Sequence, residues 1–199
     1  TGAGRGLGRE HALLLAARGA QVVVNDVSAQ HAEATAADIV AAGGQAVPDT
    51  HSVADPEGAE SIVRTAIAAF GAPHIVLNNA GRGGPTGTID QTTDDQVHTI
   101  VSTHLIGSFN VTRAAWPLLR EQSFGRVLLT ASGSALGAAG MPAYSMAKAG
   151  LYGLTRALAL EGAPLGIAVN AIAPSAKTRP GGFGPVPASP ALHEWLSVE

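Results

Sequence analysis

The stretch that decides the fold is "TGAGRGLG", Thr1–Gly8, in which every second residue is a glycine. It lacks the lysine of a phosphate-binding P-loop, and Leu7 stands where the dinucleotide fingerprint G-x-G-x-x-G needs its third glycine. The pattern that fits is T-G-x-x-x-G-x-G, formed by Thr1, Gly2, Gly6 and Gly8. Glycines so placed let the backbone approach a phosphate closely, although a flexible loop without a ligand is the alternative.

The residues after this loop favour nucleotide binding. Apolar side chains at helical spacing continue to Arg18-Gly19, a basic last turn followed by a C-capping glycine. The β-branched run QVVVND (21–26) then predicts a buried parallel strand that ends in Asp26. In a βαβ unit of this order, the helix N-terminus binds pyrophosphate and the acid binds ribose hydroxyls. Such a unit needs a strand before Thr1, so we expect the chain to be truncated at its N-terminus.

Helices and strands alternate along the rest of the chain. The predicted helices are near 28–42, 55–70, 93–121 and 142–162, and the predicted strands near 45–48, 74–81, 126–132 and 167–174. This alternation predicts an α/β fold, a doubly wound, Rossmann-like parallel sheet in a single domain over residues 1–199. The tail from Pro174 is rich in proline and glycine and contains only a short helix signal near 190–196.

Composition excludes several classes of function. A formal net charge of −3 offers no basic surface for nucleic acid. The chain has no cysteine, and its seven histidines show no metal-ligand spacing, so we expect neither disulfides nor a metal site. No apolar run approaches the roughly 20 residues of a membrane span, and no signal peptide is visible. We therefore expect a cytoplasmic protein that binds neither membranes nor nucleic acid.

Three side chains could carry proton chemistry. Tyr144 and Lys148, in "YSMAK", are four residues apart and share one helix face. An ammonium beside a phenol favours the phenolate, so we expect the pKa of Tyr144 to be lowered toward the working pH. Ser132 follows a predicted strand, at the sheet edge where ligands bind, and could donate to a substrate oxygen. Taken singly, the spacing of Tyr144 and Lys148 can arise by chance, and Ser132 can be an ordinary turn residue. The joint occurrence of the three residues favours a catalytic site.

The chain resembles the short-chain dehydrogenase/reductase family to about Arg179. The resemblance rests on TGAGRGLG, Asp26, NNAG (78–81), Ser132, YSMAK and NAIAP (170–174). It implies hydride transfer between a nicotinamide and an alcohol or ketone, with Tyr144 as general acid/base, Lys148 on the nicotinamide ribose and Ser132 on the substrate oxygen. It also implies a further last strand, so we expect truncation at both ends. The cofactor-binding residues it implies are Gly2, Arg5, Gly6, Leu7, Gly8, Asp26, Ser52, Val53, Asn79, Ala80, Gly81, Tyr144, Lys148, Pro174 and Thr178.

A narrower resemblance involves VVVND, HLIGSFNVTRAAW and NAIAPSAKTR. These segments are similar to the (3R)-hydroxyacyl-CoA dehydrogenase part of peroxisomal multifunctional enzyme type 2 and its bacterial relatives, which implies a 3-hydroxyacyl-CoA substrate. The resemblance also implies a catalytic, proton-relaying His104 where the wider family usually has Asn; a structural helix histidine is the alternative. Two other functions stay open: a reductase of acyl-carrier-protein esters, steroids or sugars, and a non-catalytic nucleotide-binding member. The intact Ser132, Tyr144 and Lys148 argue against the second.

Three positions depart from the family pattern. The interval from Ser132 to Tyr144 is one residue shorter than in the family, so Ser134 could compete for the serine's role. His51 stands where the family usually has an adenine-contacting Asp, and Ser175 where many members have glycine. The adenine contact is therefore in doubt.

Charges near the glycine loop decide the expected cofactor. Asp26 would bind a free ribose diol and repel a 2′-phosphate, whereas Arg5 would favour that phosphate or lie solvated in the loop. Because a clash with an unpaired carboxylate costs more than a surface ion pair gains, we expect NAD, with NADP less favoured.

The helices predicted near 93–121 and 142–162 carry more apolar side chains than are needed to cover the sheet. The resemblance implies that they pair across a two-fold axis, so we expect at least a homodimer, or a tetramer. The apolar stripes consist of Val97, Val101, Leu105, Phe109 and Trp116 on one helix, and of Leu151, Leu154, Thr155 and Leu158 on the other. Core positions for Leu151 and Leu158 are the alternative.

Overall fold

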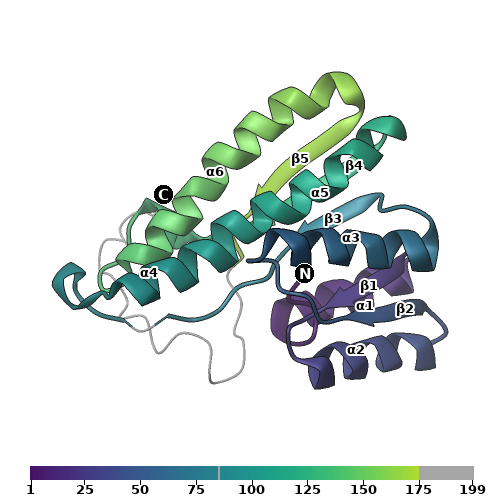
Figure 1. Cartoon of the computed structure of the whole chain (residues 1–199), viewed down its shortest axis with the longest axis horizontal. Helices are drawn as coiled ribbons and strands as arrows, with labels where there is room; N and C mark the ends of the chain where they lie inside the picture. Colours follow the sequence, from purple (N-terminus) through teal and green to yellow (C-terminus); the bar gives the residue numbers. More distant parts are fainter. Residues whose placement is uncertain (85, 175–199) are drawn as a thin grey trace, which may run out of the picture.

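In the computed structural model, which describes residues 1–84 and 86–174, helices and strands alternate as the sequence predicts (Figure 1). The strands are β1 (Gln21–Asn25), β2 (Gln45–Asp49), β3 (Ile75–Asn78), β4 (Gly125–Thr130) and β5 (Ile167–Ile172). The α-helices are α1 (Gly6–Ala17), α2 (Ala29–Ala41), α3 (Pro56–Phe70), α4 (Asp94–Val101), α5 (Gly107–Glu121) and α6 (Pro142–Gly162). The helix predicted near 190–196 lies outside the described residues.

All strand pairs in the described residues are parallel, but the strands form two sheets instead of one. β1 pairs with β2, and Val23 lies opposite Val47. β3, β4 and β5 form the second sheet, in which Val127 of β4 lies opposite Val76 and Val169. The predicted parallel α/β fold is therefore confirmed, with a break between β1 and β3.

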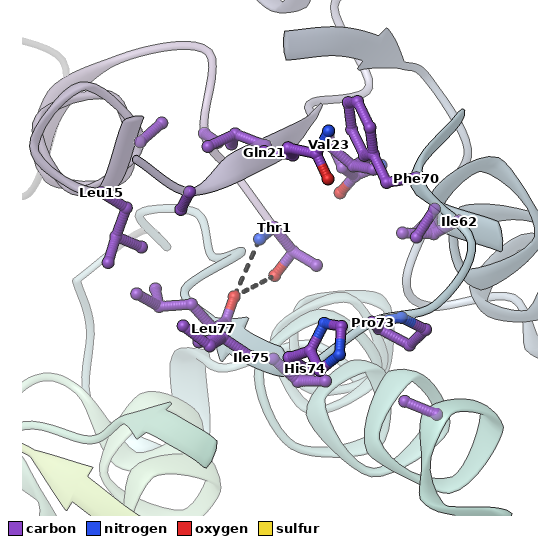
Figure 2. Close-up of a pocket in the computed structure, with 18 of the residues that line it drawn as sticks. Thr1, Leu15, Gln21, Val23, Ile62, Phe70, Pro73, His74, Ile75 and Leu77 are labelled. Atoms are coloured by element: carbon purple, nitrogen blue, oxygen red, sulfur yellow. Dashed lines mark hydrogen bonds between the residues drawn. The ribbon is translucent and has the colours of Figure 1, made fainter. Parts of the chain in front are cut away.

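A cavity of about 480 Å³ occupies this break. Figure 2 shows Gln21 and Val23 of β1 on one side of it and Ile75 and Leu77 of β3 on the other, with Thr1 between them. The Thr1 nitrogen donates to the Leu77 carbonyl oxygen at 2.8 Å. The cavity lies where a strand before Thr1 would pair with both edges, and that strand stays a prediction.

The helices pack against the sheets through separate apolar clusters. α1 and α2 pack on β1 through Ala12, Ala16, Val24, Ala36 and Ile39. α3, α5 and α6 share a larger core with β3, β4 and β5, which contains Ile62, Val111, Leu119, Val127, Leu129, Leu151, Ile167 and Val169. Strands β4 and β5 begin with alternating buried and exposed side chains. In the described residues, α3, α5 and α6 thus pack on this sheet and α1 and α2 pack on β1, in agreement with the predicted α/β fold.

The apolar stripes predicted for a dimer are mostly internal. Leu151 is buried, and Leu154 and Leu158 pack against the same core, which is the alternative named above. Phe109 is exposed as expected. Four other large apolar side chains are exposed on α6 or just before α5: Ile106, Met146, Tyr152 and Leu160. The sequence pattern singled out none of them.

The long helix predicted near 93–121 is one continuous helical segment with an irregular middle. α4 leads into a π-helical turn, Ser102–Ile106, and α5 continues from Gly107. His104 lies in the π turn, and π turns are rare enough that they frequently mark functional sites.

Candidate active site

The glycine loop is tied to the segment that follows β3. The Thr1 hydroxyl accepts the backbone N–H groups of Asn79 (3.2 Å) and Ala80 (3.1 Å). In return, the Asn79 side-chain amide donates to the Gly2 carbonyl at 3.1 Å. Gly8 packs directly on that carbonyl, so any side chain at Gly8 would overlap it. Two motifs far apart in the sequence therefore form one backbone surface.

The loop ends at an uncapped helix N-terminus. Gly2 and Gly6 have φ values of +59° and +56°, which side-chain-bearing residues rarely adopt. Arg5 occupies the N-cap of α1 but makes no capping hydrogen bond with its side chain, which is exposed, and Leu7 is half-buried. The unpaired N–H groups and the positive end of the helix dipole fit a pyrophosphate.

Asp26 lies beside this loop, one residue beyond β1. Its Oδ2 accepts the Gly4 N–H at 3.2 Å, and its Oδ1 accepts the Ser28 N–H at 3.0 Å. A methyl group on Gly4 would lie 2.8 Å from Oδ2, so glycine is needed where the loop passes the acid. The glycine loop, helix and carboxylate thus fit the pyrophosphate and ribose of a dinucleotide.

The remaining predicted cofactor residues lie at the carboxyl ends of other strands. Val53 is buried and Ser52 is exposed in the loop after β2, and Pro174 is exposed after β5. Gly81 follows β3 and packs against the His104 ring. Thr178, like Ser175, lies outside the described residues.

Ser132, Tyr144 and Lys148 converge as predicted. Pro142 begins α6, so Tyr144 and Lys148 lie in its first two turns on one face. The Lys148 ammonium is buried, donates to the Thr130 carbonyl at the end of β4, and lies 5.6 Å from the centre of the Tyr144 ring. Ser132 hydrogen-bonds Tyr144 through its side chain. Ser134, the predicted competitor, instead donates its backbone N–H to the Ser132 hydroxyl at 3.2 Å.

The pKa of Tyr144 shifts in the direction opposite to our expectation. Burial raises the pKa of this phenol, and the hydrogen bond with Ser132 offsets the rise only in part. Burial also lowers the pKa of Lys148 to about 8. Desolvation disfavours the charged form of both groups and is the largest cause of both shifts. Tyr144 is therefore a neutral phenol at pH 7.

His104 contacts both Tyr144 and the segment that follows β3. Its ring meets the Tyr144 ring edge-on, with centroids 5.2 Å apart. Its Nε2 lies 3.1 Å from the backbone nitrogen and 2.9 Å from the carbonyl oxygen of Arg82. Burial, and next the charge of Lys148, lower the pKa of His104 to about 4, so the ring is neutral at pH 7. Lys148 and His104 have backbone groups of Thr130 and Arg82 as their partners. Because every residue carries the same backbone carbonyl, the sequence pattern could not identify these partners.

His104 should make stability pH-dependent. Its native pKa of about 4 is below its unfolded value of 6.5, so the unfolded chain binds more protons and stability falls as the pH drops from 6.5 to 4. We expect a loss of about 3 kcal/mol over that interval, which His104→Gln should abolish. Urea unfolding of both proteins across this range measures the difference. His98→Ala, an exposed histidine on α4, should behave as wild type. Equal pH profiles for wild type and His104→Gln would contradict this account of the buried ring.

Comparison with known proteins agrees with this geometry. Residues 1–179 match the family described as short chain dehydrogenase. The chain belongs to the short-chain dehydrogenase family. It is 46% identical over 191 residues to a short-chain type dehydrogenase/reductase of Mycobacterium tuberculosis, covering 90% of this chain and 66% of that protein.

Two further similarities extend the comparison. The chain is 44% identical over 189 residues to the peroxisomal multifunctional enzyme type 2 of Drosophila melanogaster, covering 90% of this chain and 31% of that enzyme. The crystal structure of an NAD⁺-bound xylitol dehydrogenase superposes with a TM-score of 0.84 at 30% identity, covering 87% of this chain and 67% of that one. This short-chain dehydrogenase thus spans less than a third of the multifunctional enzyme.

No described helix is long and apolar enough to cross a membrane. Within residues 1–84 and 86–174, no group of three or more His, Cys, Asp or Glu residues could hold a metal ion. The predicted cytoplasmic location stays a prediction.

Proposed function

We propose that this short-chain dehydrogenase uses NAD to transfer hydride between nicotinamide and a secondary alcohol or ketone, with a 3-hydroxyacyl-CoA as substrate. The observation that carries the proposal is the hydrogen bond between Ser132 and Tyr144 one helical turn from buried Lys148. All three lie at the carboxyl edge of the parallel strands, as do the glycine loop and Asp26. The 3-hydroxyacyl-CoA class is supported by the motif resemblance and by the similarity to peroxisomal multifunctional enzyme type 2.

The chain's own residues would move the proton. Ser132 and Tyr144 bind the substrate oxygen; during oxidation Tyr144 first releases its own proton and then, as the phenolate, accepts the hydroxyl proton, and during reduction the phenol protonates the carbonyl oxygen. Bound NAD supplies the acceptor for the hydride that leaves the carbinol carbon. Lys148 orients the nicotinamide ribose and places a positive charge beside the phenol. His104 stays a predicted relay: while remaining neutral overall, it would accept a proton at one nitrogen and release one from the other.

The reaction is tested with a panel of alcohols. The purified protein with NAD should oxidise (3R)-3-hydroxyacyl-CoA faster than the (3S) isomer, cyclohexanol, xylitol or a hydroxysteroid, as measured by NADH formation. A clear preference for one of the other alcohols would replace the substrate class and keep the reaction. No turnover of any alcohol, together with intact NAD binding, would favour the non-catalytic alternative.

Asp26 should set the preference for NAD over NADP. Asp26→Asn removes this charge, which relieves the repulsion of a 2′-phosphate and weakens the hydrogen bonds to the ribose diol. The preference for NAD over NADP should therefore fall roughly 10- to 100-fold. The measurement is kcat/KM for both cofactors. Glu33→Gln, on exposed α2, removes an equal charge nearby and should leave the ratio unchanged. An unchanged ratio in Asp26→Asn, or a wild type that prefers NADP, would overturn the assignment.

We also propose a homodimer whose interface is formed by α5, α6 and the π turn before α5. Phe109 and Ile106 are exposed at the start of α5 and in the π turn, and Met146, Tyr152 and Leu160 are exposed on α6. Apolar side chains gathered on adjoining helices are typical of interfaces. Phe109→Glu combined with Leu160→Glu should convert a dimer to a monomer in sedimentation velocity. A wild type that sediments as a monomer at micromolar concentration would contradict the dimer.

A further inference from the structure

Gln96 is held in one orientation at the start of α4. Its Oε1 accepts the backbone N–H of Thr93 at 3.1 Å, and its own backbone N–H donates to the Thr93 hydroxyl at 3.3 Å, which forms a capping box. Because a backbone N–H can only donate, the amide atom that faces it is the oxygen, and Nε2 is left to donate elsewhere. In the part of the chain that the structure describes, this Nε2 has no hydrogen-bond partner.

α4 packs against the first turn of α6, where Tyr144 lies. Ile100 of α4 and Ala143 of α6 belong to one buried cluster, and Tyr144 packs against it (Figure 1). The loops before the two helices are joined as well, because the Gly87 N–H donates to the Gly140 carbonyl at 2.9 Å. The first turn of α4 is therefore fixed beside the proposed general acid/base.

A small cleft opens between these two helices. The residues that line it include Thr92, Gln96, Ile100, Met141 and Tyr144. Its volume of about 20 Å³ is close to that of one water molecule, so the cleft admits a single polar atom and not an acyl chain or a ring. Thr92 already donates its hydroxyl hydrogen to the Thr88 carbonyl at 3.0 Å. Among the described lining residues, Gln96 is therefore the side chain left, besides the reacting phenol, to donate a hydrogen bond into the cleft.

We propose that Gln96 binds the thioester carbonyl oxygen of a 3-hydroxyacyl substrate and is a specificity-determining residue of this site. The inference rests on the proposed function and deepens it, because it needs the substrate hydroxyl group on Ser132 and Tyr144. In such a substrate the carbonyl oxygen, which can only accept, lies two carbons from the carbinol carbon. That spacing brings it within reach of a cleft that Tyr144 itself lines. An alcohol without a second oxygen leaves the Gln96 amide without this bond.

The test uses two CoA compounds that differ only in this oxygen. One is (3R)-3-hydroxyoctanoyl-CoA, and the other is the 3-hydroxyoctyl thioether of CoA with the same arrangement at the carbinol carbon. The measured quantity is kcat/KM with NAD for the thioester divided by kcat/KM for the thioether. The two compounds differ in intrinsic reactivity to the same extent for every variant, so a change in this ratio between variants reports the contact with the carbonyl oxygen.

Gln96→Glu replaces the donor and keeps the cap. One carboxylate oxygen can still accept the Thr93 N–H, and glutamate is a usual residue at this position of a capping box, so the melting temperature should not fall. The other oxygen faces the substrate carbonyl as a second acceptor. The ratio should therefore fall about tenfold, which corresponds to the loss of one hydrogen bond.

Gln91 provides a matched control. Its Oε1 accepts the Thr88 N–H at 3.1 Å in a second capping box, but it is not among the residues that line the cleft. Gln91→Glu makes the same chemical change a few residues away and should keep the wild-type ratio. A ratio that fell equally in both variants would reveal a general effect of charge and overturn the role of Gln96.

The outcomes distinguish this inference from the proposed function. If wild type oxidises no alcohol with NAD, or oxidises others but neither CoA compound, the proposed reaction or its substrate class fails and the inference fails with it. If wild type oxidises the thioester but Gln96→Glu keeps the wild-type ratio, the role of Gln96 is wrong while the proposed function stands. A ratio that falls in Gln96→Glu alone, at an undiminished melting temperature, establishes the inference.

Discussion

Tyr144→Phe should lower kcat roughly 100- to 10,000-fold, the range expected when a general acid/base is removed. The variant loses only the hydroxyl that hydrogen-bonds Ser132, and the phenyl ring can keep its edge contact with His104. The NAD dissociation constant should change little, because the glycine loop and Asp26 are unaffected. Steady-state turnover and calorimetric titration with NAD measure the two effects separately.

The chain offers a matched control on the same helix. Tyr152 is the only other tyrosine, and it lies two turns along α6 with its side chain exposed. Tyr152→Phe also removes one hydroxyl and should retain wild-type turnover. If Tyr144→Phe kept activity within a few-fold of wild type, the general acid/base would have to be another group.

Gly8→Ala should abolish NAD binding at concentrations that saturate wild type. A methyl group at this position would overlap the Gly2 carbonyl and lie 2.5 Å from the Asn79 side-chain nitrogen. The loop would have to move away from the segment after β3, and with it the N–H groups of α1 that fit a pyrophosphate. Calorimetry with NAD measures the loss, and circular dichroism shows whether the variant remains folded.

Gly153→Ala is the control for the glycine loop. A methyl group there meets nothing within 4 Å on α6, so this variant should bind NAD normally and gain up to about 1 kcal/mol of stability. A folded Gly8→Ala protein that bound NAD as tightly as wild type would show that the cofactor lies elsewhere.

Local sequence patterns were enough to predict the fold class and to predict which residues lie together in the candidate site. The glycine spacing predicted a loop in contact with a helix N-terminus, and the four-residue interval placed Tyr144 and Lys148 on one face. Parallel strands bring their carboxyl ends together, so the positions of Asp26 and Ser132 followed from the strand order.

What the sequence did not predict depends on three-dimensional burial and partners. The pKa of Tyr144 rises because desolvation outweighs its hydrogen bond with Ser132, and spacing alone carries no information about desolvation. His51 was noted only as a departure, since its partner Asp49 is defined by a buried network with Asn25 and Thr65. The sequence pattern likewise predicted a regular helix where the π turn around His104 lies.

The most direct test of the central claim follows the hydride itself. (3R)-3-hydroxyacyl-CoA carrying deuterium on the carbinol carbon is incubated with the protein and NAD, and the reduced cofactor is analysed by mass spectrometry. We predict that the deuterium appears in the nicotinamide ring with wild type and not with Tyr144→Phe on the same timescale. Oxidation of the substrate without deuterium in the cofactor, or equal transfer by both proteins, would contradict the account.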